Sequence, residues 1–92
     1  MTIHYTKQFA KNFKKLPAHI QKLAITQEDI FKKNPSDPRL HTKPLSGSLK
    51  GVSSFRVTRE YRVLYSWKDK ENVLFYEIGH RKWIYEVSVP SE

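Results

Sequence analysis

Residues 61–79, Y-R-V-L-Y-S-W-K-D-K-E-N-V-L-F-Y-E-I-G, decide the fold of this 92-residue chain. In residues 61–67 large apolar side chains occupy every second position, which is the two-residue period of a β-strand. The polar run K-D-K-E-N that follows indicates a turn, and residues 73–79 form a second apolar segment of strand length. Because the connection is short, we expect two antiparallel neighbouring strands.

A third strand is expected immediately before this pair, in residues 52–58, V-S-S-F-R-V-T. Its alternation directs Phe55 and Val57 inward and Arg56 outward. The next strand directs Arg62 outward in the same way. The phase of the last strand is ambiguous, because both of its faces are mostly apolar.

The phase of that last strand decides whether a third arginine joins the first two. With Leu74 and Ile78 toward the core, the residues directed outward are Phe75, Glu77 and Arg81. The simplest register then gathers Arg56, Arg62 and Arg81 on one surface, and a cluster of like charges indicates that an anion binds there. Arg56 and Arg62 also have a plainer interpretation, as solvated side chains that pair with Glu60 or Glu77.

The first 34 residues predict a short strand and two helices. Ile3 and Tyr5 alternate with polar residues, and Thr6 can cap the helix that follows. That helix ends before Pro17, which suits the first turn of a second helix. Apolar residues recur at helical spacing in both: Phe9, Phe13 and Leu16 in the first, Ile20, Leu23, Ala24, Ile30 and Phe31 in the second.

The predicted order of elements is therefore β-α-α-β-β-β, in a single domain of residues 1–92. A chain of this length supports only one hydrophobic core. The proline- and glycine-containing loop of residues 35–51 returns the chain to the sheet. We predict an α+β fold in which two N-terminal helices cover one face of a small antiparallel sheet.

Charge and composition narrow the possible functions. The net charge of +8 favours a polyanionic partner, although it also serves simple solubility. The absence of cysteine excludes disulfides and thiolate metal sites. No apolar run is long enough to span a bilayer, and the N-terminus lacks the apolar core of a secretion signal. We therefore expect a cytoplasmic protein with no membrane partner.

The segment I-G-H-R-K-W-I-Y, residues 78–85, carries three groups suited to chemistry. Arg81 follows a strand end at a glycine, and Tyr85 lies one helical turn further on. A phenol beside arginines can act as a general acid or base, although Tyr85 could instead pack with its apolar neighbours. Histidine is the side chain best suited to proton transfer at neutral pH, which makes His80 a candidate, but strand alternation turns it away from Arg81. No metal site is expected, because ligand spacing is lacking among the other histidines, His4, His19 and His41.

Arginines and a phenol suit the cleavage of RNA without a metal or other cofactor. The ribose 2′-hydroxyl loses a proton and attacks the adjacent phosphate. Arginines stabilise the charge that develops on the phosphorane, and an acid protonates the departing oxygen. This chemistry requires RNA, because DNA lacks the 2′-hydroxyl.

Four segments resemble toxins of the RelE/ParE superfamily, which belong to type II toxin–antitoxin systems. They are F-A-K-N-F-K-K-L-P (9–17), P-L-S-G-S-L-K-G (44–51), F-R-V-T-R-E-Y-R-V-L-Y (55–65) and I-G-H-R-K-W-I-Y (78–85). The strand Y-R-V-L-Y followed by G-H-R-x-x-x-Y is similar to RelE-type messenger-RNA interferases, and L-S-G-S-L-K-G is similar to the YoeB branch. The resemblance implies two N-terminal helices on a small curved antiparallel sheet.

The resemblance also implies an activity and partners. It implies a ribosome-dependent endoribonuclease that cuts mRNA in the decoding site of the 70S ribosome, and an acidic antitoxin that wraps and inhibits it. The toxin alone is expected to be monomeric and its antitoxin complex oligomeric. By motif position, the residues that resemble the catalytic set are Arg56, Arg62, Arg81 and Tyr85.

The chain departs from the family pattern at two positions. Thr58 stands where RelE proteins have a second lysine, and Lys43 stands where the YoeB branch has a glutamate as base. The general base is thus open between Lys50 and His80. The basic residues expected to contact RNA are Lys43, Lys50, Arg59 and Lys82.

Two alternatives to the nuclease remain. The first is a ParE-like toxin that poisons DNA gyrase by binding it and has no nuclease chemistry. The second is an inactive basic module that only engages an antitoxin or RNA.

Overall fold

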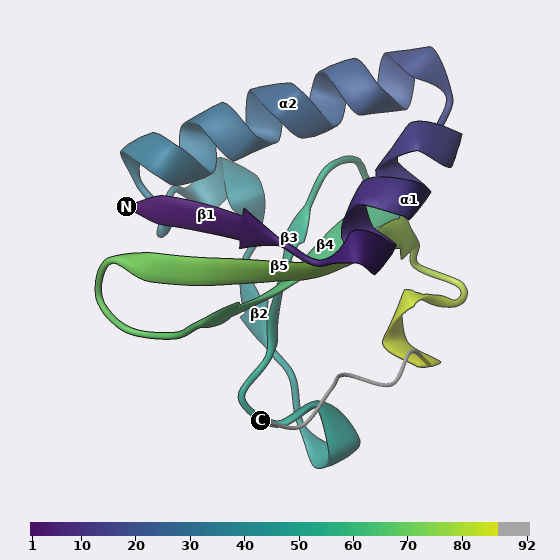
Figure 1. Cartoon of the computed structure of the whole chain (residues 1–92). Coiled ribbons are helices and arrows are strands. Elements are labelled where there is room, and N and C mark those ends of the chain that lie inside the picture. The colour runs from purple at the N-terminus through teal and green to yellow at the C-terminus, as the bar shows by residue number, and fades with distance from the viewer. Residues whose placement is uncertain (87–92) are drawn as a thin grey trace.

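The computed structural model describes residues 1–86 and places two helices on one face of a five-stranded sheet (Figure 1). The elements are β1 (Thr2–Tyr5), α1 (Lys7–Lys15), α2 (Ala18–Lys33), β2 (Lys43–Pro44), β3 (Ser53–Arg56), β4 (Tyr61–Trp67) and β5 (Asn72–His80). Short 3-10 turns occupy Pro38–Leu40, Gly47–Leu49 and Ile84–Glu86. Within the described residues, no helix is both long and apolar enough to cross a membrane.

The predicted α+β fold is confirmed, and the sheet adds two features to it. Strand order is β1-β5-β4-β3-β2, with β3, β4 and β5 antiparallel as predicted. Strand β1 pairs in parallel with β5, and the sheet is therefore mixed. The two-residue β2, which no pattern indicated, pairs with β3 at the opposite edge.

A β-bulge in β5 settles the phase that the sequence left ambiguous. Leu64 of β4 pairs with Glu77, but Tyr65 pairs with Phe75, so Tyr76 is an extra residue on β5. Side chains that follow the bulge therefore point to the opposite face of the sheet from the one that strict alternation predicts.

This change of parity corrects the expected faces of β5. The helix-side core contains Phe75 as well as Ile78, whereas Leu74 packs in the cluster on the opposite face. The expectation that Leu74 and Ile78 share the core side, with Phe75 among the arginines, is wrong. Glu77 also does not join the arginines: its Oε1 accepts hydrogen bonds from Asn12 Nδ2 of α1 and from the Ile78 backbone N–H.

The main core lies between the sheet and the helices. Phe31 of α2 is fully buried, and its ring lies 5.3 Å from Phe55 and 5.4 Å from Phe75. Ile20 and Ala24 continue the buried face of α2, and Phe9 supplies that of α1. One residue of the expected apolar stripe, Leu23, is 43% exposed.

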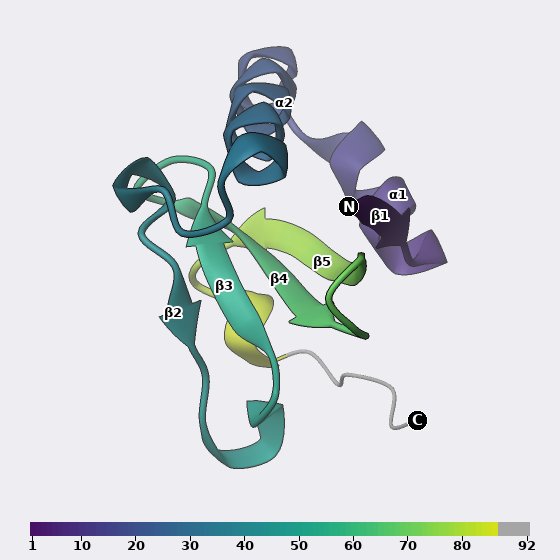
Figure 2. The same ribbon diagram turned by 90° about the vertical axis from the view of Figure 1, so that its left-hand side faces the viewer.

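A smaller cluster covers part of the sheet face opposite the helices. It joins Val52, Leu64 and Tyr76 to Ile84 of the C-terminal 3-10 turn. Figure 2 shows this yellow turn on the side of the sheet away from α1 and α2. The segment after β5 therefore folds back under the sheet, onto the face that carries the outward arginines.

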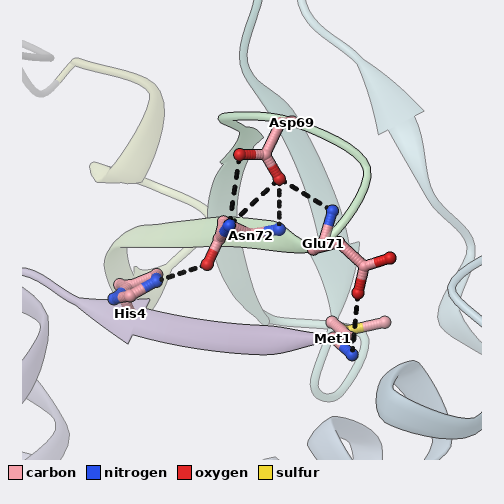
Figure 3. A network of polar contacts seen from close by, with 5 residues as sticks. All are labelled: Met1, His4, Asp69, Glu71 and Asn72. Carbon is pink, nitrogen blue, oxygen red and sulfur yellow. Dashed lines mark hydrogen bonds and ion pairs between the residues drawn. The ribbon is translucent and has the colours of Figure 1, made fainter.

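A polar network fixes β1 against the β4–β5 turn (Figure 3). One oxygen of the Asp69 carboxylate accepts hydrogen bonds from the backbone N–H groups of Glu71 and Asn72. Both oxygens also accept hydrogen bonds from the side-chain amide of Asn72. The bond from the Glu71 N–H is the main cause that holds the Asp69 pKa below its usual value. Asn72 Oδ1 lies 3.0 Å from His4 Nε2, and the amino group of Met1 lies 4.0 Å from Glu71.

Candidate functional site

Arg56 and Arg62 are cross-strand partners on β3 and β4. Their neighbours in each strand face the helix-side core, so both arginines project from the opposite face. Both are half-buried, and the Nε of each is screened from solvent without a hydrogen-bond partner. Like charges directly opposite one another are destabilising, and so is a buried donor without an acceptor. This pair therefore has the donors and the charge for an anion that would relieve both costs.

Helix α2 holds the backbone at one end of this pair. The side chain of Gln27 donates hydrogen bonds to the carbonyl oxygens of Arg56, at 2.8 Å, and Arg39, at 3.1 Å. Nothing in the sequence pattern singled out Gln27, because a side-chain amide on a helix is usually solvated.

The glycine near the end of β5, Gly79, has a structural reason. It pairs with Arg62, and a Cβ on Gly79 would lie only 2.0 Å from Cζ2 of Trp83. The indole ring of Trp83 therefore packs directly on the Gly79 backbone, on the face that Arg62 shares. Glycine is required here for close approach, and the contact directs the following segment back over the sheet.

Arg81 begins this returning segment. Its backbone N–H donates to the carbonyl oxygen of Glu60 at 2.7 Å, which ties the end of β5 to the β3–β4 turn. Further bonds from Trp83 N–H to His80 O and from Glu86 N–H to Trp83 O shape residues 81–86 into consecutive turns. The Arg81 side chain is exposed, two positions beyond the glycine that pairs with Arg62.

His80 is held at both ring nitrogens. Its Nε2 lies 3.1 Å from Oε2 of Glu60, and its Nδ1 accepts a hydrogen bond from the Lys82 backbone N–H at 3.1 Å. Its ring meets Tyr61 edge-on, with centroids 5.3 Å apart. His80 pairs with Tyr61 across the strands, so it lies on the face opposite to Gly79.

The alternative pairings for the arginines are absent from the described part of the chain. Glu60 pairs with His80, and Glu77 is buried against Asn12. The Glu60 interaction was missed from the sequence, because a histidine twenty residues away becomes its neighbour only through the β4–β5 register.

Tyr85 lies at a second part of the same face. With Lys43, Ser46 and Ser48 it lines a cavity of about 330 Å³, whose other walls come from the apolar residues of the 44–49 loop. The Tyr85 side chain is 38% exposed, while its neighbour Ile84 is buried. The structure thus brings Lys43 and Tyr85 together, although 41 residues separate them in the chain.

The remaining predicted residues lie on exposed turns. Lys50 follows the 3-10 turn before β3, Arg59 lies in the β3–β4 turn, and Lys82 follows Arg81. Lys50 does not line the Tyr85 cavity. In residues 1–86 no group of three or more histidine or acidic residues could hold a metal ion.

Comparisons with known proteins identify the family to which the chain belongs. Residues 3–85 match the family model described as ParE toxin of type II toxin–antitoxin system, parDE. The fold and the match define a toxin of the RelE/ParE superfamily. Because the match covers nearly the whole chain, the protein belongs to the ParE toxin family and is the toxin component of a type II toxin–antitoxin system.

Solved structures of bacterial toxins share the fold. YafQ from E. coli strain BL21(DE3) is 22% identical, with a TM-score of 0.76 over 91% of this chain and 97% of that one. The YoeB/ParE toxin from Agrobacterium tumefaciens is 18% identical, with a TM-score of 0.75 over 88% and 99%. A chain of the toxin–antitoxin complex RelBE2 from Mycobacterium tuberculosis is 29% identical, with a TM-score of 0.71 over 87% and 96%. A comparison with curated protein sequences gives no match.

Proposed function

We propose that this toxin is an endoribonuclease that cuts mRNA on the 70S ribosome in the cytoplasm. The observation that carries the proposal is the Arg56–Arg62 pair, whose Nε donors are buried without acceptors. A phosphodiester supplies the acceptor oxygens and the negative charge that this arrangement lacks. RelE-type interferases, which the chain resembles in its strand and terminal motifs, have the same activity.

The cleavage proceeds without a metal. The 2′-oxygen of the ribose loses its proton and attacks the adjacent phosphorus, and the bond from phosphorus to the 5′-oxygen breaks. Arg56, Arg62 and Arg81 stabilise the charge on the phosphorane, and Tyr85 donates a proton to the 5′-oxygen. The products are a 2′,3′-cyclic phosphate and a 5′-hydroxyl end. Of the two candidates for the general base, Lys50 and His80, Lys50 accepts the proton of the 2′-hydroxyl, because both ring nitrogens of His80 have partners within the protein.

Exposed basic residues suit the flanking nucleotides. Lys43 lies in the Tyr85 cavity, and Lys50, Arg59 and Lys82 are exposed on turns. Contacts of lysine and arginine with phosphates position RNA without reading its sequence. We assign these four residues to RNA binding, with affinity that falls as salt rises.

The partner of the toxin is an acidic antitoxin, and we place its docking site on the helical hairpin. A cavity of about 360 Å³ opens between α1, α2 and the sheet, with Phe9, Phe13 and Ile25 in its apolar lining. Ile25 is 50% exposed, and the lysines of α1 provide charge complementary to an acidic helix. The toxin alone is monomeric in this proposal, and its antitoxin complex is oligomeric.

Ile25→Glu tests the docking site. Co-expression with the product of an adjacent acidic reading frame should relieve growth arrest by the wild-type toxin and fail to relieve arrest by this variant. Ser36→Glu adds the same charge at an exposed position after α2 and is the control. Equal relief of both variants would place the antitoxin elsewhere.

A second candidate is a gyrase poison, which the name of the matching family model favours. One experiment compares the candidates. Purified toxin is added to ribosomes translating a defined message, the RNA ends are mapped, and gyrase supercoiling is measured in parallel. Cleavage that disappears in Arg62→Ala and Tyr85→Phe supports the nuclease. Intact RNA with inhibited supercoiling supports the gyrase poison. The absence of both RNA cleavage and gyrase inhibition supports the inactive basic module.

A further inference from the structure

We infer that Glu60 is a positioning residue, which acts through His80 to set the turn that carries Arg81 and Tyr85. The inference rests on the proposed nuclease function for its consequence in catalysis. Its structural part, the hydrogen-bond state of His80, stands on the described contacts alone.

The contacts define the tautomer of His80. A backbone N–H can only donate, so the bond from Lys82 N–H to His80 Nδ1 requires a lone pair on Nδ1. The ring proton then resides on Nε2, which faces the Glu60 carboxylate at 3.1 Å. His80 is therefore a neutral ring that donates to Glu60 and accepts from Lys82.

This arrangement assigns His80 a structural task. Both nitrogens are engaged within the protein, so neither is free to take the proton of a ribose hydroxyl. The ring instead connects the β3–β4 turn to the backbone of Lys82. Glu60 reinforces the connection a second time, because its carbonyl oxygen accepts the Arg81 N–H at 2.7 Å.

The connection reaches both proposed catalytic side chains. Arg81 lies between the two bonded positions, and the turns that begin at His80 continue through Trp83 to Glu86, enclosing Tyr85. The β3–β4 turn is itself closed by hydrogen bonds: Thr58 Oγ1 accepts the N–H groups of Glu60 and Tyr61, and Val57 N–H donates to Tyr61 O. Glu60 thus holds the terminal segment in place relative to the sheet, through its side-chain contact with His80 and its backbone bond to Arg81.

Nitrogen NMR of the imidazole ring tests the structural part directly. At neutral pH the His80 ring should show a protonated Nε2 and an unprotonated Nδ1, assigned by loss of the signals in His80→Asn. Hydrogen exchange at the Lys82 amide should speed up in Glu60→Ala but not in Glu71→Ala, an exposed glutamate of the β4–β5 turn. A protonated Nδ1, or an unchanged Lys82 amide, would overturn the inference whether or not the protein cuts RNA.

A double-mutant cycle tests the catalytic part. Glu60→Ala and His80→Ala should each lower kcat by about 10- to 100-fold with little change in KM, as expected for misplaced groups. The double variant should lose no more than the worse single variant, because both act through one connection. Glu60→Gln retains an acceptor oxygen for Nε2–H and should stay near wild type. A loss in His80→Ala of roughly 10²–10⁴ that Glu60→Ala does not share would instead identify His80 as the proton-transfer group.

Discussion

Arg56 and Arg62 lie directly opposite each other on β3 and β4, and the Nε of each guanidinium is buried without a partner. Helix α2 holds the backbone of the first through Gln27, while the second pairs with the glycine under Trp83. The pair is therefore built into the sheet and does not depend on a mobile loop. Sites on rigid strands hold a ligand more accurately than sites on loops, which suits the stabilisation of a transition state.

Removal of one guanidinium group should make the protein more stable and abolish its activity. Arg62→Met keeps the aliphatic stem but ends the repulsion, so the free energy of unfolding should rise by roughly 0.2–1 kcal/mol in urea titrations. RNA cleavage should be lost in the same variant. Arg39→Met is the control, because Arg39 already donates to both carboxylate oxygens of Asp37 and its removal should bring no gain. A clearly less stable Arg62→Met would show that the pair is not strained.

Inorganic phosphate should stabilise the folded toxin through the same two side chains. A ligand that binds only the native state at ten times its Kd adds about 1.4 kcal/mol to the free energy of unfolding. Thermal unfolding in phosphate should therefore show a higher Tm than in sodium chloride of equal ionic strength. The increment should vanish in Arg62→Met, and an equal increment in that variant would place phosphate at another site.

Gly79→Ala should destabilise the protein by about 1–3 kcal/mol, because the new methyl group overlaps the indole ring of Trp83. Chemical denaturation measures the change, and the matched comparison is the same substitution in a Trp83→Ala background. With the ring gone, alanine at position 79 should be tolerated. A loss of the same size in both backgrounds would mean that backbone conformation, not the ring, requires glycine.

Stability should fall in acid as the Asp69 carboxylate is protonated. Hydrogen bonds from Glu71 and Asn72 lower its pKa in the folded state, so the ionised form stabilises the fold above the unfolded pKa of about 3.9. That contribution is lost as pH drops below about 4 toward the lower folded pKa. Urea unfolding between pH 6 and pH 2 measures it, and the slope in this range should be smaller in Asp69→Asn. An identical slope would assign the acid sensitivity to other carboxylates.

The sequence predicts the elements of this fold better than the details of the site. Alternation in residues 52–67 places Arg56 and Arg62 on one face, and the structure agrees, since a two-residue period survives in uninterrupted strands. The same rule fails in β5, where the bulge at Tyr76 inserts one residue and reverses the parity. No local sequence pattern predicts such a bulge, because a bulge depends on how two strands pair.

Contacts between distant segments could not be predicted from the sequence for a related reason. The bond between Glu60 and His80, and the shared cavity of Lys43 and Tyr85, follow from strand register and from the way residues 81–86 return over the sheet. The sequence shows a glycine at position 79 but not the reason for it, which is the packing of the Trp83 ring on its backbone in the folded structure.

The parallel pairing of β1 with β5 has a consequence for synthesis of the toxin. Residues 2–5 pair with residues 72–75, so this edge of the sheet cannot form until residues 72–75 have been translated. Pairing between such remote segments is slow, because a long loop must close before any contact forms. A nascent chain therefore cannot complete this edge of the sheet before residues 72–75 have left the ribosomal exit tunnel.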